Sequence, residues 1–271
     1  MTPDQLHALL NKYGIKPRRE QGQNFLLDDQ VIEDTINAAQ LTKDDTVLEI
    51  GPGLGVLTQQ LAQQAGRVVA VEQDRDMIPA LKKILKIFGN VELHNADIRT
   101  FHLAEAHLRT RQYKMVANLP YNITSWVMRY FLEHEPKPSQ MVVMVQKEVA
   151  ERMIAEPGKM SVLANAVQLY ATAEIIRIVP PTSFYPAPKV ESAVISIRIR
   201  PQALSPEPEA LMRLVKICFA SKRKQLHNNL QAGLHISAVQ AKALIASIGL
   251  REDIRPQDLS IQDWEALRCI S

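Results

Sequence analysis

The sequence contains little cysteine and no long apolar run. Cys218 and Cys269 are its two cysteines, and their spacing is neither paired nor metal-like. Two isolated thiols fit a reducing compartment better than an oxidising one. No apolar run approaches the ~18 residues of a membrane span, and the N-terminus lacks the basic and apolar regions of a secretory signal. These absences predict a cytoplasmic protein without a membrane segment.

The chain also has little excess charge of either sign. The chain has 271 residues, of which 32 are Lys or Arg and 29 are Asp or Glu, for a net charge of +3. A global positive field is thereby excluded, so any contact with nucleic acid must come from local basic patches. The seven histidines are scattered, without metal-site or catalytic-triad spacing, and no metal is predicted.

A strand, a glycine-rich loop and a helix follow one another early in the chain. Thr46–Ile50 is apolar and β-branched, Gly51-Pro52-Gly53-Leu54-Gly55 follows it, and an apolar-periodic helix comes next. This order is typical of the nucleotide-binding βα unit, in which glycine lets a ligand approach the backbone. The segment predicts a nucleotide-type cofactor site.

Acidic side chains end the next two predicted strands. Glu72 follows the strand at 67–71, roughly 20 residues past the loop, where a carboxylate can accept both ribose hydroxyls. Asp97 follows the strand at 91–94 and is placed to accept from an adenine amino group. The alternative for Glu72 is a solvated side chain after a strand.

The residues Asn118-Leu119-Pro120-Tyr121 end a fourth predicted parallel strand at 114–117. Pro120 fixes its own φ and cannot donate to a ladder, so the chain must turn here. An amide oxygen, a carbonyl oxygen and a ring suit a flat group with an exocyclic NH2, such as adenine. The alternative is a plain turn, because such tetrapeptides are common.

More elements are predicted downstream. Thr124 or Ser125 is expected to cap a helix whose inward residues are Trp126, Val127, Tyr130 and Phe131. Residues 141–145 predict a fully buried strand, and residues 192–200 alternate as in a half-buried strand. The proline-rich stretch 180–190 predicts a stiff loop that holds Phe184 for base stacking, with core packing as the alternative.

Two cofactor classes fit a glycine loop. The third glycine here comes one residue earlier than in the G-x-G-x-x-G of NAD-dependent oxidoreductases. Glu49 stands just before the loop, where its charge would face a dinucleotide pyrophosphate. A carboxylate there better suits a cation, such as a sulfonium with its α-amino group, so we predict S-adenosyl-L-methionine (SAM) rather than NAD.

Three prolines between residues 201 and 208 predict a linker, and the pattern beyond it is helical. The predicted domains are therefore a catalytic domain at 1–200, with a basic N-terminal arm, and a helical domain at 201–271. Two local basic clusters are candidates for phosphate contact, with a solvated surface as the alternative. Their residues are Lys16, Arg18, Arg19, Lys222, Arg223 and Lys224.

Five segments in order resemble the ribosomal RNA adenine dimethyltransferases, the KsgA-type family. They are Gly22-Gln23-Asn24-Phe25-Leu26, residues 49–55, residues 118–123, residues 184–192 and residues 222–224. The resemblance extends from about residue 16 to the end of the chain, and five motifs in order are highly specific. It implies an α/β class I SAM-dependent methyltransferase (Rossmann-like) fold with a small all-helical, rRNA-binding C-terminal domain.

The resemblance also implies a reaction, a partner and residue roles. The reaction is dimethylation of N6 of two adjacent adenosines in the 3′-terminal hairpin of 16S rRNA, within the 30S subunit, and a role in 30S biogenesis. A monomer is expected. The implied SAM-binding residues are Asn24, Leu26, Gly51, Gly53, Glu72, Asp97 and Asn118. The implied catalytic residues are Asn118, Leu119, Pro120, Tyr121 and Phe184, with the two rings enclosing the flipped adenine.

Two other functions stay open from sequence. One is an antibiotic-resistance methyltransferase that acts on large-subunit rRNA, which shares the cofactor fold. The other is an RNA-binding assembly factor that has lost catalysis, against which the intact Glu49, Glu72, Asp97 and Asn118 argue.

Overall fold

The computed structural model describes residues 3–15, 23–221 and 224–270. They divide into two compact units, one made of Met1–Ala150 with Glu174–Ile199, the other of Glu151–Ala173 with Arg200–Ser271. Residues 151–173 thus group with the C-terminal residues, whereas the predicted boundary at residue 200 places them in the first domain. In the described part of the chain, no helix combines the length and the apolar character needed to cross a membrane.

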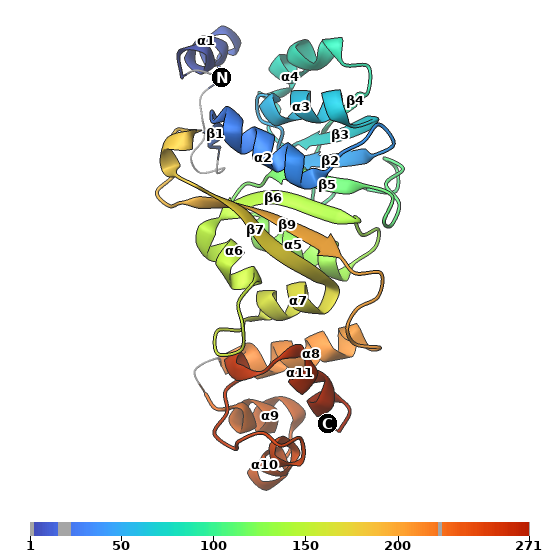
Figure 1. The fold of residues 1–271 in the computed structure, drawn as a ribbon, viewed down its shortest axis with the longest axis vertical. Helices are drawn as coiled ribbons and strands as arrows, with labels where there is room; N and C mark the ends of the chain where they lie inside the picture. Colours follow the sequence, from blue (N-terminus) through green and yellow to red (C-terminus); the bar gives the residue numbers. More distant parts are fainter. Residues whose placement is uncertain (1–2, 16–22, 222–223, 271) are drawn as a thin grey trace. The chain divides into compact units, whose positions relative to one another are not determined.

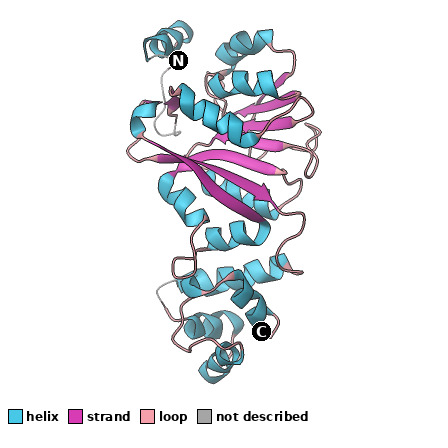
Figure 2. Cartoon of the chain, viewed as in Figure 1, coloured by secondary structure: helices cyan, strands magenta, loops and turns pink. Residues whose placement is uncertain are grey.

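The first unit is built on a seven-stranded sheet, whose arrangement can be followed in Figures 1 and 2. In spatial order its strands are β4 (Val91–Asn95), β3 (Arg67–Glu72), β2 (Thr46–Ile50), β5 (Lys114–Asn118), β6 (Gln140–Gln146), β9 (Ser192–Ile199) and β7 (Ala171–Val179). The first five run parallel, which confirms the predicted parallel set. The chain builds outward from β2 to β4 and then returns to β5 on the other side of β2. Such a reversal point is where open α/β sheets bind ligands.

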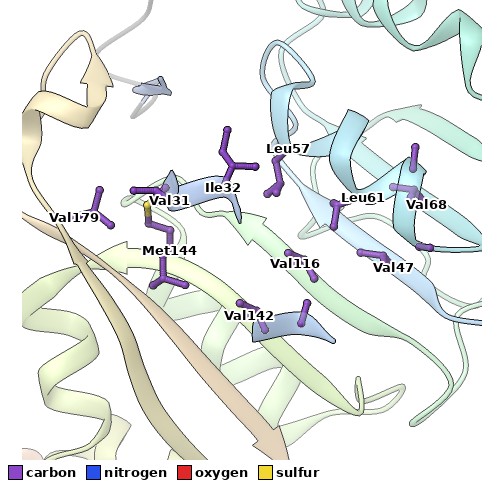
Figure 3. Close-up of a cluster of buried hydrophobic side chains, with 14 of the residues drawn as sticks. Val31, Ile32, Val47, Leu57, Leu61, Val68, Val116, Val142, Met144 and Val179 are labelled. Atoms are coloured by element: carbon purple, nitrogen blue, oxygen red, sulfur yellow. The ribbon is translucent and has the colours of Figure 1, made fainter. Parts of the chain in front are cut away.

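Helices α2 (Asp29–Ala39) and α3 (Val56–Gln64) pack on one face of this sheet. The Asp28 carboxylate caps α2 by accepting from the backbone N–H groups of Gln30 and Val31. Apolar residues of both helices and of the strands beneath them form one buried cluster (Figure 3). Helix α4 (Ile78–Ile84) belongs to a second cluster, with Leu54 and Met77.

Two predicted elements differ from expectation in their burial. The strand β9 was expected to be half-buried, but seven of its eight residues are buried because it lies inside the sheet, between β6 and β7. Helix α5 (Thr124–Glu133) has no side-chain cap. Its buried face is Thr124, Val127, Met128, Phe131 and Leu132, while Trp126 and Tyr130 are only half-buried. The predicted cap at Thr124 or Ser125 and the predicted core positions of Trp126 and Tyr130 are therefore wrong, whereas those of Val127 and Phe131 are confirmed.

Three N-terminal and loop elements carry no signal that predicted them from the sequence. Helix α1 (Pro3–Tyr13) contributes Leu6 and Leu10 to the second cluster. The short strands β1 (Phe25–Leu26) and β8 (Phe184–Tyr185) pair antiparallel, with Leu26 opposite Phe184. The proline-rich loop is thus stiffened by pairing with the N-terminal segment, as well as by its own prolines.

The second unit is helical apart from the first residues of β7 (Figure 2). It contains the last residues of α6 (Lys147–Met153), α7 (Val162–Tyr170), α8 (Pro208–Cys218), α9 (Leu226–Leu234), α10 (Ala238–Ser247) and α11 (Ile261–Arg268). Helix α7 packs against α8 and α11. Ser237 and Ser260 each begin a capping box, and the Trp264 ring is fully buried.

The core around α3 should be sensitive to the loss of volume. Leu61 is 0% exposed within the first cluster, so we expect Leu61→Ala to lower the free energy of unfolding by about 2–5 kcal/mol. Ile87→Ala is a matched control, because Ile87 is 81% exposed and should change stability by no more than about 0.5 kcal/mol. Urea unfolding measures both, and equal effects of the two substitutions would contradict this assignment of the core.

Candidate active site

A cavity of about 240 Å³ lies at the carboxyl ends of β2, β3 and β5. It gathers residues from segments that are far apart in the sequence. The lining includes residues 23–26, 49–54, 72–74 and 118–123, together with Phe184. Every predicted catalytic residue and every predicted SAM-binding residue except Asp97 lines this one cavity.

All three glycines of the loop, Gly51, Gly53 and Gly55, have positive φ values, and the first two lie in the wall of the cavity. Gly51 and Gly53 have φ values of 69° and 59°, in the left-handed region that side chains disfavour. The missing side chain of Gly51 faces the Pro120 ring, and that of Gly53 faces the Phe25 ring, each 3.5 Å from where a Cβ would lie. The loop therefore joins the turn after β5 to the N-terminal segment.

Glu49 is a buried carboxyl in the wall of the cavity. It is 1% exposed, and its Oε2 has no hydrogen-bond partner. Burial raises its pKa to about 8; the nearby Thr58 hydroxyl lowers the pKa, and the charge of Glu72 raises it. A buried acid in this state favours a cationic ligand, since a cation beside it would compensate the desolvated charge.

Glu72 organises the backbone around it. Its Oε2 accepts from the Gly53 N–H at 3.1 Å and its Oε1 from the Asp74 N–H at 2.8 Å. Burial raises its pKa, and these two hydrogen bonds oppose the rise. Asp74 in turn accepts from the Gln23 side-chain amide at 2.7 Å. The chain just after β3 is thus tied both to the glycine loop and to the N-terminal segment.

The turn after β5 is held by three hydrogen bonds of different kinds. The Asn118 Nδ2 donates to the Asn24 carbonyl at 3.4 Å, which leaves Oδ1 as the acceptor end of the amide. The Leu119 N–H donates to the Met144 carbonyl at 3.1 Å. The Tyr121 hydroxyl lies 2.6 Å from Ser192 Oγ, at the start of β9. The amide and the ring are therefore fixed before any ligand binds.

The Phe184 ring packs in the core and also lines the cavity. It is 4% exposed and belongs to the first core cluster, and it also lines the cavity. The core-packing alternative for this residue is therefore true, and it does not exclude a stacking role. The Ser183 hydroxyl donates to Asp28 at 2.9 Å, which anchors β8 beside the start of α2.

Asp97 is engaged elsewhere. Arg99 donates from Nε to both carboxylate oxygens at 3.0 Å and from Nη2 at 2.5 Å, and this partner lowers the pKa of Asp97. Its neighbours Ala96, Ile98 and Arg99 line the cavity, while Asp97 does not. The predicted role of Asp97 as acceptor for an adenine amino group stays a prediction, and in this structure Arg99 occupies its carboxylate.

The predicted RNA-contact residues are only partly covered by the structure. Lys16, Arg18, Arg19, Lys222 and Arg223 lie outside the described residues. Lys224 is described, and it is exposed. In the described ranges, no group of three or more His, Cys, Asp or Glu side chains is placed to hold a metal ion.

Several lining residues were not predicted. Leu6 comes from the unpredicted helix α1, and Met77 comes from the turn before α4. Phe25 packs on Gly53. Its position between Asn24 and Leu26 was the one signal that could have identified it, whereas Leu6 carries no signal because its helix reads as an ordinary amphipathic segment.

Comparisons with known proteins give one consistent family. The model of the family described as "Ribosomal RNA adenine dimethylase" matches residues 14–266. A protein named "Ribosomal RNA small subunit methyltransferase A" from Dehalococcoides mccartyi is 41% identical over 97% of this chain and 91% of its own length. A protein of the same name from Alkaliphilus metalliredigens is 38% identical over 98% of this chain and 96% of its own length.

Two solved structures share the fold. A dimethyladenosine transferase from Plasmodium falciparum superimposes with a TM-score of 0.78 and 26% identity, over 90% of this chain and 95% of its own. The 23S rRNA methyltransferase ErmE superimposes with a TM-score of 0.72 and 27% identity, over 90% of this chain and 98% of its own.

The buried acid predicts a pH-dependent effect of Glu49→Gln. The folded pKa of about 8 exceeds the ordinary value of 4.5, so the stability that protonated Glu49 contributes is complete below pH 4.5 and is lost as pH rises towards 8. The loss is of order 3 kcal/mol by pH 7. The amide of the Glu49→Gln variant does not titrate. The melting temperature of the ligand-free variant, relative to that of wild type, should therefore rise from pH 5 to pH 8.

Thermal unfolding at several pH values, without and with SAM, measures this effect. Added SAM should stabilise wild type more than the variant. Parallel pH profiles of the two ligand-free proteins would contradict the burial of an unpaired carboxyl at this position.

Proposed function

This chain belongs to the ribosomal RNA adenine dimethylase family, and we propose that it dimethylates N6 of two adjacent adenosines in the 3′-terminal hairpin of 16S rRNA. The single observation that carries the proposal is that Asn118, Leu119 and Tyr121 line the same cavity as the buried acids Glu49 and Glu72. The proposed adenine clamp, formed by Asn118, Leu119 and Tyr121, and the proposed site for a cationic cofactor thus lie in one cavity. The small-subunit substrate is supported by the names of relatives at 38–41% identity.

The enzyme uses SAM, and the residues present fit this cofactor. Glu49 offers a buried carboxyl with an unpartnered oxygen, which suits the ammonium or sulfonium cation. Gly51 and Gly53 would line the methionine part, and Glu72 would hold the ribose. Asn24 and Leu26 would close the site from the N-terminal segment. When bound, SAM supplies an electrophilic methyl group on a sulfonium.

The adenine N6 atom is a poor nucleophile, since its lone pair is delocalised into the ring. Asn118 Oδ1 and one backbone carbonyl would accept its two N–H groups and so localise that lone pair for in-line attack. This is orientation plus electrostatics, with no strong base required. The proposal thus needs two acceptors fixed at the end of β5.

The structure favours Leu119 over Pro120 as the backbone acceptor. The Pro120 carbonyl already accepts from the Ile123 N–H at 3.2 Å and from the Thr124 hydroxyl at 3.1 Å. A carbonyl oxygen has two lone pairs, so both are in use. The Leu119 carbonyl has no such donors among the described residues, and it follows Asn118 directly.

The target base must leave its stack, which costs a few kcal/mol. Stacking on Tyr121 and Phe184 would return roughly 1–3 kcal/mol each. Tyr121 is held for this role by its hydrogen bond to Ser192, which is fully buried. The ring is therefore ordered in advance, and its entropy is not lost on binding.

The proposal includes the partner and the division of labour in the chain. The 30S particle is the proposed substrate of a monomer that acts in the cytoplasm. Residues 1–200 would perform catalysis, and residues 201–271 would add rRNA contacts. The proposed phosphate contacts are Lys16, Arg18, Arg19, Lys222, Arg223 and Lys224, and Asp97 would reach the cofactor adenine if Arg99 releases it.

The reaction can be tested by radiolabelled methyl transfer from SAM to unmethylated small subunits, with large subunits and naked rRNA in parallel. We expect label as N6,N6-dimethyladenosine in the small subunit alone. Label in the large subunit would favour the alternative suggested by the similarity to ErmE. Tight particle binding with no label anywhere would indicate an assembly factor without catalysis.

Asn118→Ala tests the clamp. Losing the amide acceptor should lower turnover roughly 100-fold or more, by analogy with the loss of one transition-state hydrogen bond elsewhere. The SAM dissociation constant should change little, because Glu49, Glu72 and the glycine loop remain. Asn37→Ala is a matched control, since Asn37 is exposed on α2. Equilibrium SAM binding and single-turnover rates separate the two effects, and loss of SAM binding alone would sink the clamp.

A further inference from the structure

Helix α5 carries three aromatic rings that are stacked along its axis. The Trp126 and Tyr130 rings lie 4.8 Å apart, centroid to centroid, at 15°, and the Tyr130 and His134 rings lie 5.3 Å apart at 16°. The spacing i, i+4, i+8 puts the rings on one stripe of the helix. This stripe is separate from the buried face, since Trp126 and Tyr130 are half-buried and His134 is exposed. Tyr130 also contacts the buried Phe131 ring edge-on, at 5.2 Å between centroids, so core packing accounts for part of the position of Tyr130 but not for its stacking on Trp126.

The Trp126 end of the stack follows a turn that lines the cavity, although Trp126 itself is not a lining residue. Its rings follow in order along the axis, so one face of Trp126 is covered by Tyr130 and the other face is turned towards the start of α5. Helical side chains lean over the turn N-terminal to their own Cα, which for Trp126 is the turn of Asn122 and Ile123. Both of these residues line the cavity. In the ranges that the structure describes, Tyr130 provides the one ring contact of Trp126.

Hydrogen bonds attach the start of α5, and with it the stacked rings, to the turn that contains Asn118 and Tyr121. The Thr124 hydroxyl donates to the Pro120 carbonyl at 3.1 Å, and the Val127 N–H donates to the Ile123 carbonyl at 2.9 Å. The first turn of α5 is thus locked to the turn that contains Asn118 and Tyr121. Trp126 has a fixed position relative to a base held in the cavity.

A cation lies beside the stack. Arg129 is exposed, one turn after Trp126, and it forms no ion pair with any residue that the structure describes. It is therefore available for a phosphate of the same nucleic-acid strand. A flat π surface with an adjacent guanidinium is the combination that binds unpaired bases of single-stranded nucleic acid.

From these contacts we infer that the face of Trp126 that Tyr130 does not cover binds the base of the nucleotide next to the target adenine. The inference rests on the proposed function and deepens it, because two adjacent adenosines must take turns in one cavity. While one adenine is in the clamp, its neighbour is also pulled from its stack, and Trp126 replaces the lost stacking partner. Tyr130 and His134 hold the Trp126 ring in place.

Trp126→Leu tests the inference, with Trp126→Phe as the variant that keeps a ring. The intact substrates are small subunits and a synthetic 3′-terminal hairpin, if the wild-type protein methylates that hairpin. Two further hairpins carry an abasic residue, one on the 5′ side and one on the 3′ side of the target adenosine. We expect Trp126→Leu to lower kcat/KM on the intact RNA roughly 5- to 100-fold, the range for one lost base-stacking contact. Trp126→Phe should retain most of the activity.

The abasic hairpins distinguish base stacking from a structural role, because a structural defect of Trp126→Leu would lower kcat/KM equally on intact and abasic RNA. On the one that lacks the stacked neighbour, wild type should lose the same factor, and Trp126→Leu should lose nothing more. Phe88→Leu is the control for removing a half-buried ring elsewhere in the first unit and should leave kcat/KM and SAM affinity unchanged.

Two outcomes would overturn the inference while the proposed function stands. One is equal kcat/KM for Trp126→Leu and wild type on the intact RNA. The other is a Trp126→Leu defect that persists undiminished on both abasic hairpins, which would make the ring a structural element. A wild-type protein that methylates none of the small subunits or hairpins would remove the proposed function, and this inference with it.

Discussion

The site depends on the close approach of two strand ends that lie more than 60 residues apart in the sequence. Strands β2 and β5 pair in parallel, with Leu48 opposite Met115, so the glycine loop after β2 and the turn after β5 emerge side by side. Gly51 then meets the Pro120 ring without a side chain between them. Because this contact joins the cofactor loop to the adenine clamp, the distance between the two ligands is set by the sheet itself.

That arrangement places two buried acids in one wall. Glu49 and Glu72 are 1% and 7% exposed, and burial raises the pKa of both. Glu72 offsets its burial by accepting two backbone N–H groups, whereas Glu49 Oε2 has no such partner. The unpartnered Glu49 carboxyl therefore lowers the stability of the ligand-free protein, and a cationic cofactor bound beside it would offset that loss. The site thus has lower stability but is already arranged to bind a cation.

Local sequence patterns identified most of the fold and the lining because they follow short-range rules. The strands β2 to β6, the glycine loop and the turn at Asn118 each carry their own signal of periodicity, glycine or proline. Errors arose where tertiary context decides. Strand β9 has an alternating pattern but lies inside the sheet, and helix α5 begins without the predicted side-chain cap. The pairing of β1 with β8 involves two residues on each side, too few to show any period.

That two-residue pairing explains how the N-terminal segment can serve both ligands. Asn24 accepts from Asn118 through its carbonyl, and Leu26 pairs with Phe184. The Gln23 amide reaches Asp74 beyond β3. One short segment thus touches the cofactor side, the clamp and the second stacking ring through separate contacts. Any shift of this segment would change all three contacts together, so the proposed closure over the cofactor would also reposition the proposed base site.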